Sequence, residues 1–176
     1  MEGILPRPRS QSGPYGQTCA RDVGMKIVLL ITVLAAMTAC AFIGGDDEET
    51  TLQCANCRDA EVERVFDGDT LITTSDRVIR LYGVDAPEGE ERCASKAAER
   101  LRELAGGTIR LEDGPSRTDE LGRTTAYVYT QDGASVDEIL IREGLATAST
   151  GAGQHRGFLA NLELEAKTKD AGCLWQ

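Results

Sequence analysis

Apolar and polar residues alternate in short runs through the middle of this chain, a pattern that is typical of half-buried β-strands. The runs predict five strands, at Glu61–Phe66, Thr70–Thr74, Val78–Gly83, Thr108–Glu112 and Thr124–Thr130. A weaker last strand is expected at Leu145–Ala148. In the third strand Ile79 and Leu81 share one face, so Arg80 points away from the presumed core and is free to meet a ligand.

Helical spacing of apolar residues follows or interrupts these strands. Ser95 is expected to cap a helix that ends near Ala105, Ser135 opens a short helix, and a final helix runs from Phe158 to about Ala171. Short strands with one helix inserted among them and another closing the chain predict a mainly β fold with α, a five-stranded, partly open barrel of the OB kind.

An apolar run precedes this domain. Met25 and Lys26 open the run, which ends in small residues directly before Cys40. This pattern predicts a lipoprotein signal peptide, cleaved before Cys40 so that the new N-terminal cysteine carries a lipid. Plain secretion and an uncleaved membrane helix are the alternatives; the run of 17 residues from Ile27 to Ile43 is at the lower edge of the roughly 17–25 that a spanning helix needs.

Four regions follow from these signals. Residues 1–24 are expected to be an unstructured extension, and Met25 is an alternative start because a signal peptide needs nothing ahead of it. Residues 25–39 are the predicted signal peptide, residues 40–56 an acidic tether, and residues 57–176 the folded domain. The protein is therefore expected to be exported and lipid-anchored at the cell envelope, with secretion as the second possibility.

The charge of the chain limits how it could hold nucleic acid. The whole sequence has a net charge of −10, and residues 40–176 carry 27 acidic and 15 basic side chains, a net charge of −12. Tight binding over a wide surface needs many basic residues to neutralise phosphates. Any phosphate chemistry must therefore be local, with arginines gathered in one cleft.

Four cysteines remain after the proposed lipid site and upstream Cys19 are set aside: Cys54, Cys57, Cys93 and Cys173. In an oxidising compartment they suggest two disulfides, for which three connectivities exist. The CxxC spacing of the first pair could also belong to a zinc or redox site. A zinc site would need a second CxxC or paired histidines, and His155 is the only histidine. Structural bridges are favoured.

Two strand ends are rich in carboxylates. The first is Asp67-Gly68-Asp69-Thr70, and the second, Arg80-Leu81 followed by Asp85-Ala86-Pro87-Glu88, begins with an arginine. Carboxylate oxygens suit a hard cation, and an arginine fork suits a phosphate. A third run, Arg117–Arg123, supplies another arginine. Together they indicate phosphodiester cleavage.

These motifs, joined by Val136-Asp137-Glu138 leading to Gly144-Leu145-Ala146, resemble the staphylococcal nuclease (thermonuclease-like) family over roughly Glu61 to Trp175. The resemblance implies a five-stranded OB barrel with three helices, which agrees with the strands and helices expected above. It also implies the substrate and products: single-stranded DNA or RNA, cut with little sequence preference to leave 3′-phosphate ends. A monomer is expected.

The resemblance implies one calcium ion (Ca2+) as cofactor. Asp69 and Asp85 would bind it through their carboxylates, helped by the backbone carbonyl of Ala86. Asp67 and Thr70 would surround the metal site without touching the ion.

The same resemblance implies the catalytic residues. Glu88 would orient or deprotonate the attacking water as general base, while Arg80 and Arg123 would bind the scissile phosphate and stabilise the charge that develops there. It also implies a Cys93–Cys173 bridge, with Cys54 and Cys57 paired or free.

The sequence departs from the family pattern at two positions. The family prototype places aromatic rings beside the nucleotide where this chain has Leu121 and Thr150. Since stacking is worth about 1–3 kcal/mol per base, weaker nucleotide binding is expected. A non-catalytic OB-fold binding module on an envelope lipoprotein is the alternative function, and a vestigial nuclease-like site is a further one. The five intact site residues favour catalysis.

Overall fold

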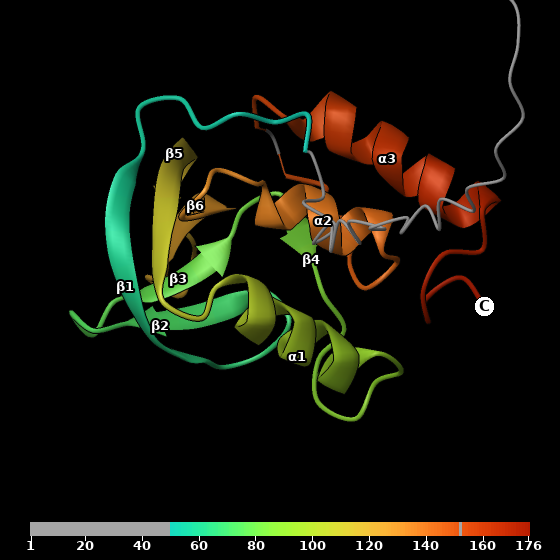
Figure 1. The fold of residues 1–176 in the computed structure, drawn as a ribbon, viewed down its shortest axis with the longest axis horizontal. Coiled ribbons are helices and arrows are strands. Elements are labelled where there is room, and N and C mark those ends of the chain that lie inside the picture. Colours follow the sequence, from blue (N-terminus) through green and yellow to red (C-terminus); the bar gives the residue numbers. More distant parts are fainter. Residues whose placement is uncertain (1–49, 152) are drawn as a thin grey trace, which may run out of the picture. The chain divides into compact units, whose positions relative to one another are not determined.

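The computed structural model of the protein describes residues 50–151 and 153–176 (Figure 1). The expected extension 1–24, the signal peptide 25–39 and the lipidation site Cys40 lie outside the described residues. No helix in the described part of the chain combines the length and apolar character needed to cross a membrane.

Five strands close into a barrel in the order β1-β2-β3-β6-β5. They are β1 (Arg58–Val65), β2 (Thr70–Thr73), β3 (Val78–Leu81), β5 (Thr108–Thr118) and β6 (Thr124–Thr130). Neighbouring strands are antiparallel except for β3 and β6, which are parallel. With its three helices, this barrel confirms the expected fold class. The strand β5 extends beyond Glu112, where the sequence prediction ended it, through an irregularity in its pairing with β6.

The last expected strand is shorter than predicted and does not join the barrel. Thr147–Ala148 forms β7, which pairs with β4 (Val84–Asp85) in a separate two-stranded sheet. The residues before it are held elsewhere, because the backbone N–H groups of Leu145 and Ala146 donate to the Leu140 carbonyl at the end of a helix. This small sheet fixes the position of Asp85.

The helices are α1 (Ala94–Leu104), α2 (Val136–Arg142) and α3 (Arg156–Thr168). Ser135 caps α2 as expected, since its side chain accepts a hydrogen bond from the Glu138 N–H. The N-cap of α1 is Cys93 rather than Ser95, and it supplies no side-chain hydrogen bond. In Figure 1, α2 lies between the barrel and α3, and it packs against α1, α3 and β6.

One apolar core fills the barrel and the space beneath the helices. Its fully buried large side chains come from the inward positions of the strands and from all three helices: Leu71, Ile79, Leu81, Ile109, Leu111, Leu101, Leu140, Ile141 and Leu159. The alternation predicted for β3 is confirmed, because Ile79 and Leu81 enter this core.

The packed part of the chain begins before Cys57, within the segment expected to be tether. Thr50 and Leu52 are buried. The carboxylate of Glu138, itself fully buried, accepts hydrogen bonds from the backbone N–H groups of Thr51 and Leu52 at 2.9–3.0 Å and pairs with Arg142 at 2.6 Å. The buried Glu138 therefore holds the segment just before β1 against α2.

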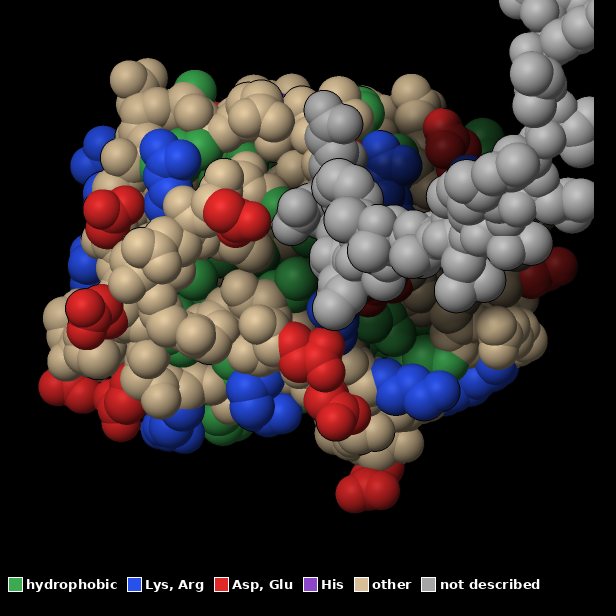
Figure 2. Space-filling model, in the orientation of Figure 1, with side chains coloured by type: hydrophobic (Ala, Val, Ile, Leu, Met, Phe, Trp, Pro, Cys, Tyr) green, Lys and Arg blue, Asp and Glu red, His purple; other side chains and the backbone are tan. Residues whose placement is uncertain are grey.

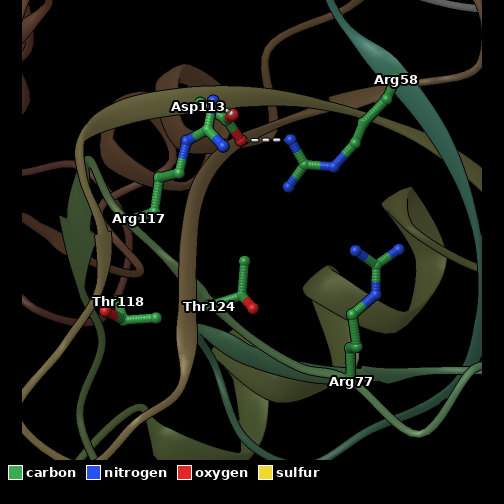
Figure 3. Close-up of a pocket in the computed structure, with 6 residues that line it drawn as sticks. All are labelled: Arg58, Arg77, Asp113, Arg117, Thr118 and Thr124. Carbon is green, nitrogen blue, oxygen red and sulfur yellow. Dashed lines mark hydrogen bonds and ion pairs between the residues drawn. The ribbon is translucent and has the colours of Figure 1, made fainter.

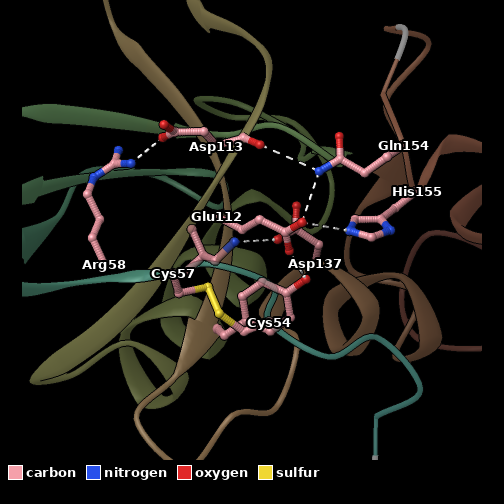
Figure 4. The surroundings of a disulfide bond; sticks show 10 residues. Cys54, Cys57, Arg58, Glu112, Asp113, Asp137, Gln154 and His155 are labelled. Carbon is pink, nitrogen blue, oxygen red and sulfur yellow. Dashed lines mark hydrogen bonds and ion pairs between the residues drawn. A yellow bond between two sulfur atoms is a disulfide. The ribbon is translucent and has the colours of Figure 1, made fainter.

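Both disulfides join the pairs that the resemblance allowed, Cys54–Cys57 and Cys93–Cys173. Figure 4 shows a polar network around the first bond, centred on buried Glu112. Its carboxylate accepts hydrogen bonds from Tyr129 Oη at 2.7 Å and Gln154 Nε2 at 3.0 Å. Burial opposes ionisation of Glu112, but these hydrogen bonds outweigh it and lower the pKa of this carboxyl. The network holds Gln154, which lies just before α3, against β5.

Removing the Cys93–Cys173 bridge should destabilise the domain far more than removing Cys54–Cys57. The two bridges span 80 and 3 residues, and a longer closed loop restricts the unfolded chain more. We expect the Cys93→Ala/Cys173→Ala variant to lose about 2–4 kcal/mol of unfolding free energy in urea. The matched Cys54→Ala/Cys57→Ala variant should lose less, and equal losses would contradict the argument.

Candidate active site

The first carboxylate motif forms a tight turn between β1 and β2. The backbone N–H groups of Phe66 and Asp67 both donate to the Thr70 carbonyl, and the Asp67 side chain accepts the Asp69 N–H at 3.1 Å. Gly68 is required here by close packing, since a Cβ would lie 2.6 Å from the Cβ atoms of both Ala86 and Ala97. This close packing places Asp69 next to Ala86 in the second carboxylate motif.

Asp69 is almost completely buried, with 1% of its surface exposed. Its Oδ1 accepts a hydrogen bond from Thr70 Oγ1 at 3.1 Å, and its Oδ2 accepts the Ala86 N–H at 2.7 Å. Burial raises the pKa of Asp69 to about 6, although the nearby Arg80 guanidinium and the Ala86 N–H act in the opposite direction. Thr70 thus contacts the Asp69 carboxylate and Asp67 the Asp69 backbone, while their place around a metal stays a prediction.

Arg80 links the two carboxylate motifs. Its Nη2 lies 3.0 Å from Asp69 Oδ2 and 2.6 Å from Asp85 Oδ1. Its Nη1 donates to the carbonyls of Leu81 and Val84 at 2.6 and 2.7 Å. The side chain points away from the core as predicted, but it is only 14% exposed and is engaged by these groups rather than free.

The positions of Asp69 and Asp85 show whether the two carboxylates could bind one metal ion together. Two carboxylate oxygens within hydrogen-bonding reach of a single Arg80 nitrogen lie close enough to share one cation. Asp85 is about half exposed, so water can reach the pair. Among the described residues no three acidic, histidine or cysteine side chains gather to hold an ion by themselves. The donor set therefore fits an oxygen-loving cation that completes its shell with a backbone carbonyl and water.

Glu88 lies in the loop between β4 and α1, three residues after Asp85. Its side chain is exposed, and its backbone N–H donates to Glu91 Oε2 at 3.2 Å while its carbonyl accepts the Glu91 N–H at 3.0 Å. Within the described residues, no contact joins Glu88 to Asp69 or Arg80. The loop presents the Glu88 carboxylate to solvent, and its role as general base stays a prediction.

Arg123 is held by Asp119 in the loop between β5 and β6. Asp119 Oδ1 accepts the N–H groups of Leu121 and Arg123 at 3.0 and 2.8 Å, and its Oδ2 accepts Arg123 Nε at 2.6 Å. Because β3 and β6 are parallel with Arg80 opposite Thr125, Arg123 enters the sheet next to the strand that carries Arg80. The sequence contained Asp119, but its role as the group that orients Arg123 depends on the folded loop.

Asp137 is a second residue whose role appears only in the fold. Its buried carboxylate accepts the Gly83 N–H and the Val128 N–H, both at 2.9 Å, and so joins α2 to β6 and to the segment between Arg80 and Asp85. Burial raises the pKa of Asp137 to about 6. A Cβ on Gly83 would lie 2.7 Å from Asp137 Oδ1, which explains the glycine.

No aromatic ring stands at the two positions, 121 and 150, where the resemblance implied one. Leu121 is 79% exposed and Thr150 is exposed, so neither offers a ring to a base. Tyr127 and Tyr129 are buried packing residues, and Tyr82 packs edge-on against Tyr127 with 5.4 Å between ring centroids. The sequence prediction missed Phe66, which is 67% exposed beside the Asp67–Asp69 turn.

Comparison with known proteins agrees with this fold. Residues 78–176 match the family described as Staphylococcal nuclease homologue. The thermonuclease of Staphylococcus hyicus is 34% identical over 137 residues, which cover 68% of this chain and 78% of that protein. The chain therefore belongs to the staphylococcal nuclease homologue family.

Two other relatives match this chain over less than half of their own length. The SPbeta prophage-derived endonuclease YokF of Bacillus subtilis (strain 168) is 39% identical over 99 residues, which are 50% of this chain and 33% of YokF. Endonuclease YncB of the same organism is 38% identical over 96 residues, 48% of this chain and 45% of YncB. The chain thus spans less than half the length of these two relatives.

Proposed function

We propose that this protein is a calcium-dependent phosphodiesterase that hydrolyses single-stranded DNA or RNA with little sequence preference and leaves 3′-phosphate ends. The observation that carries this proposal is the convergence of Asp69 and Asp85 on Arg80 in a chain of this family. The named activities of the relatives, thermonuclease and endonuclease, support the reaction class.

Asp69, Asp85 and the carbonyl of Ala86 are the groups that would hold the calcium ion, as the resemblance implies. When bound, the ion would polarise a phosphate oxygen and offset the charge of the carboxylates. Asp69 must be ionised to serve as a ligand, and the N–H of Ala86 and the hydroxyl of Thr70 stabilise its carboxylate.

Two arginines would bind the scissile phosphate. The planar fork of Arg123, fixed at Nε by Asp119, presents its outer nitrogens to a pair of phosphate oxygens. The Nη1 of Arg80 donates to two backbone carbonyls, which hold the side chain at the site. It would stay there whether its Nη2 faces the carboxylates or a phosphate. Both cations would stabilise the negative charge that grows on the phosphate oxygens.

Glu88 would accept the proton of the attacking water. The oxygen of that water forms a bond to phosphorus, the bond from phosphorus to the 5′ oxygen breaks, and the leaving oxygen takes up a proton. The products are a 3′-phosphate and a 5′-hydroxyl. The exposure of Glu88 lets it return its proton to solvent for the next turnover.

The proposal is tested by incubating the oxidised protein with single-stranded DNA and RNA, in calcium and in chelator, and identifying the ends produced. Calcium-dependent cleavage with 3′-phosphate ends would support it. Saturable binding by the folded protein without metal-dependent turnover would overturn it in favour of the OB-fold binding module.

Acidity should weaken calcium binding. Because burial raises the pKa of Asp69 to about 6, the carboxyl keeps its proton below that pH, and the proton competes with the metal. From pH 7 to pH 5 the apparent Kd for calcium should rise about tenfold, as expected when one proton must be displaced. Calorimetric titration at pH 5, 6 and 7 would measure this. A constant Kd would contradict it, and Asp69→Asn should bind weakly at every pH.

We also propose that the protein acts outside the cytoplasm as a monomer, held at the cell envelope by a lipid on Cys40. The sequence pattern before Cys40 supports the anchor, and two disulfides suit an oxidising compartment. Mass spectrometry of the N-terminal peptide from the native host would identify the lipid; an unmodified Cys40 would leave secretion as the explanation.

A further inference from the structure

A second cationic feature lies outside the candidate active site. A pocket of about 430 Å³ opens where the first residues of β1, β3 and β6 meet the far end of β5 (Figure 3). We call it the arginine pocket, and it is lined by Arg58, Arg77, Asp113, Arg117, Thr118 and Thr124. None of these six residues was assigned a role in binding or catalysis above.

The arginine pocket carries a positive charge in a strongly acidic chain. Its three arginines and one aspartate give a formal charge of +2, whereas the whole chain is −10. On the face seen in Figure 2, acidic and basic side chains are interspersed rather than gathered into one basic surface. The pocket therefore offers local positive charge to an anionic polymer, although the chain as a whole is negative.

Asp113 organises the arginines without neutralising all of them. It pairs with Arg58 and lies 3.3 Å from Arg117 Nη2, and the hydrogen bond from Arg58 holds the pKa of Asp113 below its usual value. Arg117 is nevertheless 81% exposed. Arg77 bonds the hydroxyl of Ser75 and has no acidic partner among the described residues. In Figure 3, Arg58 and Arg77 reach toward the same opening from two elements.

The pocket is continuous in sequence and sheet register with the candidate active site. Thr124 follows Arg123 directly, and Thr118 precedes Asp119, the residue that orients Arg123. Arg77 precedes Arg80 by three residues, which is about 10 Å along an extended strand. That length corresponds to about three stacked nucleotides at 3.4 Å each. When Arg80 and Arg123 hold the scissile phosphate, a phosphate about three nucleotides away on the same strand could therefore reach the arginine pocket.

We propose that the arginine pocket binds a backbone phosphate of the same polynucleotide strand, a few nucleotides from the scissile bond. This inference rests on the proposed function. Arginine forks and threonine hydroxyls recognise phosphate oxygens, and the pocket contains no aromatic ring to stack on a base. It thus favours longer strands over short ones without selecting a sequence. Its local positive charge also offsets the repulsion between the negatively charged chain and the negatively charged substrate.

The test compares two double variants that remove the same charge. Arg77→Gln/Arg117→Gln changes the pocket, and Arg102→Gln/Arg156→Gln changes exposed arginines on α1 and α3. For a strand of about twelve nucleotides we expect the pocket variant to raise KM about tenfold or more with kcat unchanged. For a dinucleotide substrate KM should not change. The control variant should resemble the wild type on both substrates.

A binding measurement separates this inference from the proposed function. Affinity for the same strand is measured at several salt concentrations by fluorescence anisotropy, in chelator so that no cleavage occurs. Loss of this one phosphate contact should reduce the slope of log K against log salt by about 0.7, the value for one neutralised phosphate of a single strand. An unchanged slope and KM, or equal effects in the control variant, would overturn the inference. A wild type that binds but cleaves neither substrate would instead overturn the proposed function.

Discussion

Replacing Glu88 by glutamine is expected to lower kcat for calcium-dependent cleavage by about 10²- to 10⁴-fold, the range that a positioned general base contributes. Glutamine has nearly the same shape as glutamate but cannot accept the proton of the attacking water. The Glu88 side chain is exposed, and its hydrogen bonds to Glu91 are made by backbone atoms. The thermal unfolding midpoint should therefore remain that of the wild type.

The matched control is Glu90→Gln, an exposed glutamate of the same loop that has been given no role in the reaction. Both variants remove one negative charge from the same exposed loop, so a general electrostatic effect would appear in both. Initial rates in calcium separate the two explanations, because a general electrostatic effect lowers kcat in both variants, whereas loss of the base lowers kcat only in Glu88→Gln. Near wild-type turnover in Glu88→Gln would exclude this residue as the base.

The barrel and the residue types of the site could be predicted from sequence, because both depend on local patterns. Alternation placed Ile79 and Leu81 in the core and Arg80 on the opposite face, and the structure confirms this. The turn that carries Asp69 follows from a glycine flanked by aspartates. What could not be predicted is which of these charged groups meet. Arg80 was expected to be free, but it pairs with Asp69 from the turn between β1 and β2 and with Asp85 from β4.

Contacts between distant segments also set the limits of the domain and of the pocket. Leu52 follows an acidic run with no apolar period, and only the position of Glu138 on α2 shows that this segment is packed. The arginine pocket likewise joins Arg58, Arg77 and Arg117, which are separate in sequence and belong to no common motif. Contacts between residues so far apart in sequence form only when the barrel closes. They cannot be predicted from the local pattern of any one strand.

The largest effect on stability is expected for Asp137→Ala. This change leaves the N–H groups of Gly83 and Val128 buried without their acceptor, at about 1–3 kcal/mol each, so a loss of about 2–6 kcal/mol is expected in urea unfolding. Asp59→Ala, at an exposed position of β1, is the control and should change stability by less than about 0.5 kcal/mol. Because Gly83 lies between Arg80 and Asp85, the folded fraction of Asp137→Ala should also cleave more slowly. A loss no larger than that of the control would show that the two N–H groups find other partners.

The pH dependence of stability provides an independent check on Asp137. Burial raises its pKa to about 6 in the folded protein from 3.8, so the folded state binds the proton more tightly than the unfolded state. The resulting stabilisation is complete below about pH 4 and is lost as the pH rises through 6. Asp69 titrates in the same direction, so the wild type is compared with Asp137→Asn, which keeps Asp69 and removes only the titration of Asp137. Between pH 4 and pH 7 the unfolding free energy of the wild type should fall by about 2–3 kcal/mol relative to Asp137→Asn, at 1.36 kcal/mol per pKa unit. Parallel curves for the two proteins would mean that the Gly83 and Val128 N–H groups fully offset the cost of burying the charge, and that Asp137 is ionised throughout this range.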